Sequence, residues 1–477
     1  MVERVRRCAA VLTLVVLAAP PTLAWSQPAP GGPPSAPAPP PIPPVPPVPE
    51  AAPGQPLTLA AAVSTALQQN LQVRTAAVQV ALARAQLRQA EAGFQPTVGL
   101  QGSYTTQSSS GGSILSGTLT VPGAGIVGQP FVAQVPSLGA APSWLVRLNV
   151  AYPLYTGHAL EDQLAIARAS VRSAEAAFAA VANQVVLSVR QAYYGLELAQ
   201  GTVGAAQRAV DAAQENVRVT AARVRVGTSP RFDLLQAQVQ LAQSQQNLTR
   251  AKTGLVQAQQ TLALVLNQPL TTRYQPVTPL GLPAPPPNVD ALVRMALQQR
   301  PELIQARANV EAAEAAIDLA AAGRRPNITL TGGPTVATSD PTERLPVSWT
   351  GAIQVTLAIL DGGLTDAKVE AARQQLAQAQ LAEQQLRQTI EQQVRTAYLG
   401  LQDAAEELRS ARAALESARE ALRIANVRFQ AGVGTQLEVV TAEQNLASAD
   451  VGTVQALYAY NLALAQLDQA VGVQVKF

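Results

Sequence analysis

Two copies of one long sequence pattern make up most of this chain of 477 residues. The segment 190–196 (RQAYYGL) reappears at 395–401 as RTAYLGL, 205 positions later. Other pairs that correspond at this offset are Gly227 and Gly432, Asp233 and Glu438, and Trp144 and Trp349. Because the repeated unit is far longer than the roughly 20 to 50 residues of a solenoid repeat, it is a duplicated half of the protein. We therefore expect both halves to fold alike.

The two copies differ in length at one place. Upstream of the tryptophans the offset is 230, since Pro96 corresponds to Pro326, so the first copy carries 25 additional residues. They fall within 105–143, a stretch rich in Ser, Gly and Pro that lacks Asp, Glu, Lys and Arg. Such a composition predicts a mobile external loop, whose counterpart at 333–348 is short.

The N-terminus has the pattern of a secretory signal peptide, which we predict at 1–26. Three arginines precede an apolar stretch at 9–19. The only cysteine, Cys8, lies before that stretch, so the mature chain is expected to lack disulfides and thiol chemistry. Without the signal, 31 basic and 30 acidic residues remain, a balance that gives no case for nucleic acid as a partner. No later apolar run is long enough for a transmembrane helix.

Two proline-rich segments divide the rest of the chain. Residues 27–56 contain 15 prolines and predict a disordered or semi-rigid tether, which acts either as a spacer or as a contact to a partner. Residues 271–288 are a second proline-rich segment and are expected to link the repeats 57–270 and 289–473. Each repeat is expected to begin with a helix, at 57–93 and at 289–323.

A β-hairpin is predicted in each repeat, at 97–155 and at 327–360, because apolar and polar residues alternate there. Alternation over about ten residues is what a transmembrane strand requires, and Trp144, Trp349 and Tyr152 would then belong to an aromatic girdle at the lipid boundary. Half-buried strands of soluble sandwiches alternate in the same way. Four strands cannot close a barrel, since the smallest have about eight, so strands in a membrane would require several chains.

Long helical hairpins are predicted at 161–266 and 364–471. Apolar residues recur every seven positions at Leu196, Val203, Val210, Val217 and Val224, and again at Leu401, Leu408, Leu415, Leu422 and Phe429. Sustained heptads predict coiled-coil packing. A helix over 161–226 would be about 100 Å long at about 1.5 Å per residue, a length that suits a device crossing a periplasm-sized gap.

The tips of these hairpins carry a family resemblance. Residues 225–237 (RVGTSPRFDLLQA) and 429–442 (FQAGVGTQLEVVTA) both place an acid six positions after a glycine. With the duplicated strands and heptads, the chain resembles the TolC family of outer-membrane efflux proteins over about 57–473. The resemblance implies a mainly α fold with a β portion: a homotrimer with a twelve-stranded barrel in outer-membrane lipid and a twelve-helix barrel across the periplasm. It also implies two partners, a periplasmic adaptor and an inner-membrane pump, and a passive conduit.

The resemblance also assigns roles to the tips, which would form a closable entrance and meet the adaptor. The residues so implicated are Val226, Gly227, Thr228, Ser229, Gly432, Val433, Gly434 and Thr435. For the glycines, turn formation alone is an equally good interpretation.

In the family, carboxylates after the second tip line the narrowest part of the lumen. Glu438 matches the first such position, and three copies would form an acidic ring that favours cations. The second position is Thr441, so a double ring is not expected. The alternative interpretation of Glu438, and of Asp233, is a solvated acid that stabilises a helix N-terminus.

The resemblance further suggests how the entrance closes. In the family type member, an aromatic residue and an arginine reach an acid on the first tip. Phe429 and Asp233 match the aromatic residue and the acid, whereas Gly434 stands at the arginine position. Arg428 or Arg231 would have to substitute for it.

Sequence patterns of enzymes, cofactor sites and metal sites are absent, and the single histidine, His158, provides no metal cluster. Two alternatives to an efflux channel remain open. The exit duct of a type I protein secretion system shares the architecture, and a structural periplasmic coiled coil would explain the heptads.

Overall fold

A computed structural model describes residues 55–108, 112–119, 129–136, 140–277, 288–338 and 346–472. The chain divides into two units, residues 1–49 and residues 50–477, and all described residues belong to the second. The predicted signal peptide at 1–26 and nearly all of the predicted tether lie outside the described residues.

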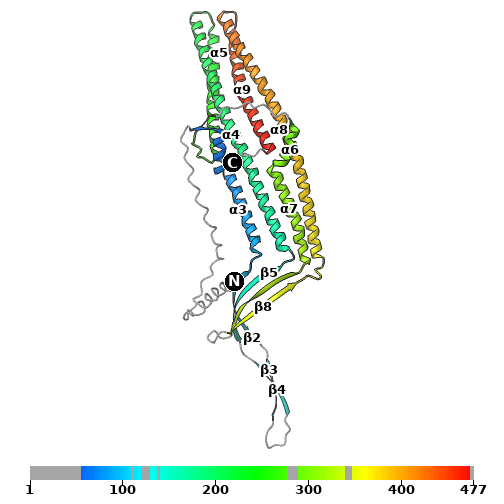
Figure 1. Cartoon of the computed structure of the whole chain (residues 1–477). Helices are drawn as coiled ribbons and strands as arrows, with labels where there is room; N and C mark the ends of the chain where they lie inside the picture. The colour runs from blue at the N-terminus through cyan, green and yellow to red at the C-terminus, as the bar shows by residue number, and fades with distance from the viewer. Residues whose placement is uncertain are drawn as a thin grey trace, which may run out of the picture. The chain divides into compact units, whose positions relative to one another are not determined.

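Helices dominate the described residues, and the second repeat follows the element order of the first (Figure 1). The first repeat and the linker contain β1 (Gln55–Leu57), α2 (Leu59–Gln69), α3 (Leu71–Ala92), β2 (Thr97–Ser108), β3 (Gly112–Leu119), β4 (Gln129–Pro136), β5 (Ala140–Tyr155), α4 (Ala159–Arg225), α5 (Arg231–Val265) and β6 (Tyr274–Pro276). The second contains α6 (Val289–Gln299), α7 (Pro301–Ala321), the short 3₁₀ helix η1 (Ala322–Arg324), β7 (Asn327–Thr338), β8 (Val347–Thr356), α8 (Leu364–Gln430) and α9 (Gln436–Val471).

The first helix of each repeat is broken in two, whereas the sequence predicted one continuous helix at 57–93 and one at 289–323. Asn70 is extended, and its side chain accepts a hydrogen bond from the Gln72 backbone N–H, which makes it the N-cap of α3. In the second repeat Arg300 is extended and Pro301 is the first residue of α7. A proline disfavours the helical conformation in the residue before it and is favoured at a helix start, which explains the break.

The predicted external loop at 105–143 contains regular structure. Strand β2 continues to Ser108, β5 begins at Ala140, and β3 and β4 form an antiparallel ladder between them. The predicted linker also contains a strand: β6 pairs in parallel with β1, so Gln55 and Pro56, the last residues of the predicted tether, are part of a small sheet. In the second repeat β8 ends at Thr356, before the end of the predicted hairpin at 360.

The two strand pairs of the repeats join into one antiparallel sheet of order β2-β5-β7-β8. The junction between the repeats is the β5–β7 pair, in which Trp144 lies opposite Thr338 and Tyr152 opposite Leu330. Strands β2 and β8 are the outer edges of this sheet within one chain. The mainly α fold with a four-stranded β portion, which the sequence predicted, is confirmed.

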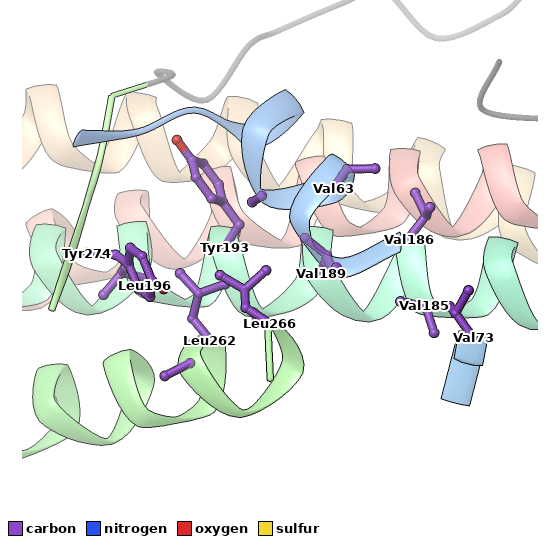
Figure 2. Close-up of a cluster of buried hydrophobic side chains, with 14 residues drawn as sticks. Val63, Val73, Val185, Val186, Val189, Tyr193, Leu196, Leu262, Leu266 and Tyr274 are labelled. Carbon is purple, nitrogen blue, oxygen red and sulfur yellow. The ribbon is translucent and has the colours of Figure 1, made fainter. Parts of the chain in front are cut away.

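Each repeat has its own hydrophobic core where the short helices pack on the long ones. Figure 2 shows the first, in which Val189 and Tyr193 of α4 lie near Leu262 of α5. The Tyr193 hydroxyl donates to the Leu57 carbonyl oxygen over 3.0 Å, so the polar end of this buried ring is satisfied and β1 is attached to α4. The second core uses Ile390, Val394, Leu401 and Tyr460.

Helix α4 occupies the centre of the chain and packs against α2, α3, α5, α7 and α9 (Figure 1). Helix α8 also has 67 residues but packs mainly against the second-repeat helices α6, α7 and α9, and it meets α4 only near its C-terminal end in the described part of the chain, where Val219 packs against the cluster of Ala425 and Phe429. At about 1.5 Å per residue both are about 100 Å long. Helix α4 thus has neighbours from both repeats, while α8 lies at one edge of the chain and α3 and α5 at the other.

Candidate functional site

The two hairpin tips, residues 226–230 and 431–435, turn the chain with the same backbone hydrogen bonds. Thr228 N–H donates to Arg223 O over 3.0 Å, and Val433 N–H donates to Arg428 O over 3.0 Å, at positions 205 residues apart. Gly227 and Gly432 have φ values of 79° and 76°, in the left-handed region that favours glycine at helix C-termini. Turn formation therefore requires both glycines, whatever else they contact.

Most of the residues that the sequence analysis assigned to the adaptor lie exposed at these tips. Val226, Gly227, Thr228, Gly432, Val433 and Thr435 are exposed, whereas Ser229 and Gly434 are half-buried. Two further apolar residues, Phe232 and Leu437, are exposed at the tips; they correspond at the 205 offset and were not predicted from the sequence. An apolar residue immediately before the acid in both tips was the available signal.

Two acids begin the returning helices. Asp233 and Glu438 are the only acids in the first turns of α5 and α9, where a negative charge stabilises the helix N-terminus. Glu438 Oε2 lies 3.3 Å from Arg428 Nε, while Asp233 has no ion pair among the described residues. Thr441, one turn after Glu438, is also exposed.

Phe429 is a core residue within one chain, with only 6% of its surface exposed. It packs with Ala425, Val439 and Ala442, and Val219 of α4 covers the same cluster. Its heptad position predicted this burial. The predicted gate residues therefore comprise two exposed polar groups, Glu438 and Thr441, the half-buried Asp233, and one buried ring.

Gly434 cannot be replaced by the arginine of the family type member without a backbone shift. A β-carbon at this position would lie 2.9 Å from Phe429 N and 3.0 Å from Arg428 Cβ. The arginine that reaches the second tip is instead Arg223, near the end of α4. Its Nη1 donates to Phe429 O over 2.9 Å, its Nη2 lies 3.5 Å from Gln430 O, and its Cζ lies 4.1 Å from the Phe429 ring centroid. This role of Arg223 was not predicted from the sequence.

A polar cluster of Asn216, Thr220, Gln436 and Glu443 lies between α4 and α9 near the tips. Gln436 Nε2 donates to Asn216 Oδ1 over 2.8 Å, and Asn216 Nδ2 donates to Glu443 Oε2 over 3.2 Å. Thr220 Oγ1 lies 3.3 Å from Asn216 Oδ1 and 3.4 Å from Gln436 Oε1. Burial raises the pKa of Glu443 to about 7, against a smaller lowering by the Asn216 hydrogen bond.

The four-stranded sheet exposes one apolar face. The large apolar residues exposed there include Val98, Leu100, Trp144, Val146, Tyr152, Trp349, Ile353 and Val355. Trp144 contacts Tyr104, with ring centroids 4.6 Å apart and the ring planes tilted by 50°. Trp144 and Tyr152 are separated by about 27 Å at about 3.4 Å per residue, close to the ~25 Å apolar band of outer-membrane barrels. Arg147 lies between them in sequence and, because successive strand residues alternate, belongs to the opposite face of β5. Its Nε donates to Thr335 Oγ1 over 3.3 Å.

The described residues contain no helix that is both long and apolar enough to cross a membrane. In the same part of the chain, no group of three or more His, Cys, Asp or Glu residues could hold a metal ion.

The comparison with protein families decides the assignment. A family model described as outer membrane efflux protein matches residues 62–268 and 292–473, which include both hairpins and both tips. The chain belongs to the outer membrane efflux protein family. As a family member it is a transport protein of the outer membrane that extends into the periplasm, and it is not an enzyme.

Solved structures agree with this efflux-protein fold. The channel-forming protein CusC shares 23% identity, with a TM-score of 0.73 over 87% of this chain and 92% of CusC. CmeC, an outer membrane channel of Campylobacter jejuni, shares 19% identity, with a TM-score of 0.71 over 88% and 87%. The Neisseria gonorrhoeae outer membrane channel MtrE, in its open state, shares 21%, with a TM-score of 0.70 over 87% and 88%. A search of curated protein sequences found no match.

Proposed function

We propose that three copies of the chain form a passive efflux conduit from the periplasm to the exterior, gated at the helical tips. The main observation in support is that helices at the edges of one chain expose apolar residues whose counterparts in the other repeat are buried. Val78 on α3 is 65% exposed, whereas its counterpart Ala308 on α7 is 4% exposed. Leu381 on α8 is 65% exposed, and its counterpart Ala176 on α4 is 7% exposed.

A neighbouring copy of the chain would cover these exposed apolar edges. Within one chain α4 packs against α7 and α9, so by the repeat symmetry α8 should pack against the α3 and α5 of the next copy. The same operation brings β8 beside β2 of the next copy, which removes both open sheet edges, as lipid requires. With four strands in each chain, three copies give a twelve-stranded barrel, within the size range of outer-membrane barrels.

The tips would form the periplasmic entrance. Glu438 and Thr441 are exposed one helical turn apart, and Asp233 has no ion pair within the described part of the chain, so these groups are available to line a lumen. Three Glu438 carboxylates around an axis would favour cations. The exposed apolar Phe232 and Leu437 would dock the periplasmic adaptor, through which an inner-membrane pump supplies the energy.

Fractionation, gel mobility and conductance test this proposal together. We expect the protein in the outer membrane, as a trimer that dissociates on heating, and as a pore in planar bilayers. A soluble periplasmic monomer would instead support the structural coiled coil. Recovery of the chain with a type I secretion pump, rather than a drug or metal pump, would favour protein secretion.

The selectivity proposal has a separate test. Glu438→Ala should reduce the preference of the pore for cations, because it removes one charge per chain from the entrance. Thr441→Ala, one turn away, is the matched control. Unchanged ion selectivity in Glu438→Ala would show that Glu438 is only a solvated helix residue.

A further inference from the structure

We infer that Arg223 and the polar cluster fasten the two hairpin tips of one chain to each other and so hold the periplasmic entrance closed. This inference rests on the proposed channel function. Arg223 belongs to the first repeat, whereas Phe429 and Gln430, which its guanidinium contacts, belong to the second. Its contacts therefore join the two repeats at the entrance itself.

Three physical effects act together at Arg223. The Phe429 and Gln430 carbonyls are at the C-terminal end of α8, where the helix dipole favours a cation. The Phe429 carbonyl already accepts from the Gly432 N–H over 3.1 Å, and Arg223 supplies a second donor to it. The guanidinium also lies over the Phe429 ring, at 4.1 Å from its centroid, within the range of a cation–π contact. Only a planar group with several N–H donors can serve a carbonyl pair and an aromatic face at once, so lysine cannot replace it fully.

The polar cluster extends the same connection along α4 and α9. Asn216, Thr220 and Gln436 are buried, and each finds its hydrogen-bond partner within the cluster. Separating α9 from α4 would break the contacts of Asn216 with Gln436 and Glu443, and would leave only the contact between Thr220 and Asn216 within α4. Unless water replaced the lost partners, buried polar groups would be unpaired, which is costly. The cluster thus opposes separation of the two tips.

The repeat provides an internal comparison, because the equivalent positions lack this connection. Asn216 and Thr220 correspond to Ala421 and Ala425, which have no polar side chain. Phe429 corresponds to Val224, which has no ring, and Arg428, the counterpart of Arg223, pairs with Glu438 of its own hairpin. The fastening is therefore particular to the contact between the two repeats within a chain.

The test is single-channel recording of the full-length trimer in planar bilayers with Arg223→Ala. We expect the ratio of open to closed time to rise about tenfold, which corresponds to ~1.4 kcal/mol. Arg223→Lys should lie between Arg223→Ala and the wild type. Phe429→Leu keeps an apolar side chain in the core and should produce a smaller rise. Arg218→Ala is the control, because within the described part of the chain Arg218 forms an ion pair only with Glu215 on its own helix.

The outcomes separate the two proposals. If intact Arg223→Ala and Phe429→Leu trimers gate like the wild type, the fastening is overturned while the channel proposal stands. If the wild type forms no pore, the channel proposal itself fails. If Arg218→Ala opens the channel as much as Arg223→Ala, a general charge effect explains the result and the fastening is again overturned.

Discussion

Gly201 of α4 and Val454 of α9 lie so close that a β-carbon added at Gly201 would be 2.6 Å from Val454 Cγ1. Helices α4 and α9 of the two repeats therefore approach closely at a position where α4 has no side chain. Farther along the same contact, Arg208 Nε lies 3.0 Å from Asp450 Oδ2, and Arg190 Nη1 lies 2.7 Å from Asp468 Oδ2. The contact between α4 and α9 thus combines close packing with ion pairs that are partly exposed.

Gly201→Val should destabilise the protein by about 1 to 3 kcal/mol, the usual cost of overpacking. The added side chain would have to displace Val454, whose branched β-carbon leaves it little freedom. The measurement is the denaturant midpoint of the purified trimer. Gly195→Val on the same helix is the matched control, since a β-carbon there meets nothing within 4 Å. Equal losses in both variants would mean that only helix propensity is involved.

A disulfide should form within one chain in the double variant Gly201→Cys, Val454→Cys. The added β-carbon at Gly201 lies 3.6 Å from Val454 Cβ, inside the ~3.5–4.5 Å range of disulfides. The only natural cysteine, Cys8, is in the predicted signal peptide. Thiol titration before and after reduction measures the bond, and the oxidised protein should run as a monomer on a denaturing gel. Cross-linked dimers would place α9 beside the α4 of another chain.

Leu381→Asp should convert the trimer to monomers without loss of helix content. A carboxylate at this apolar edge position would be desolvated against the neighbouring copy, which is costly without a partner. Analytical ultracentrifugation and circular dichroism in detergent measure the two effects. Leu381→Met preserves apolar volume and should remain trimeric. A Leu381→Asp trimer as stable as the wild type would mean that α8 does not form the contact between chains.

The stability of the tip region should fall as pH rises from about 5 to 8. Burial raises the pKa of Glu443 from 4.5 to about 7, so the folded state favours the protonated carboxyl. The stability that the protonated Glu443 carboxyl contributes is complete below the pKa of the unfolded state, and it is lost as pH rises through the pKa of about 7 in the folded state. Besides the neutral Asn216, the groups near the Glu443 carboxyl include two ion pairs, Arg208 with Asp450 and Arg419 with Glu416.

Hydrogen exchange of the tip amides across this pH range, corrected for intrinsic rates, measures the effect. Glu443→Gln should remove most of the pH dependence, because it leaves a neutral group in the same place. Asp211→Asn, an exposed change on α4, should retain the wild-type profile. If Glu443→Gln behaves like Asp211→Asn, the carboxyl does not control tip stability.

The sequence predicted the long helices and the paired strands well, because heptads and alternation are local patterns that packing then reinforces. It predicted the interior position of Phe429 from its heptad and, from the family resemblance, a gate role for the same residue. The structure places the Phe429 ring in a hydrophobic core near the tip, where the ring also contacts the Arg223 guanidinium. In the proposed fastening, this contact is how a buried ring acts on the entrance. The gate roles of Asp233, Glu438 and Thr441 remain predictions.

Features that depend on contacts between distant segments could not be predicted. The break at Asn70 is reinforced when its Nδ2 donates to Val265 O over 2.9 Å, a partner 195 residues away. The β1–β6 pair joins segments that composition alone classed as a tether and a linker. Arg223 is one arginine among many on α4, and only the folded position of Phe429 distinguishes it.

The equal length of α4 and α8 has a mechanical consequence. A ring of six identical hairpins would have six identical joints, and a change that stiffened one would stiffen all of them. In the proposed ring of three chains, two 67-residue helices with different sequences would give two kinds of joint in alternation. Stiff and compliant contacts would then occupy different joints of the ring, an arrangement that identical hairpins do not allow.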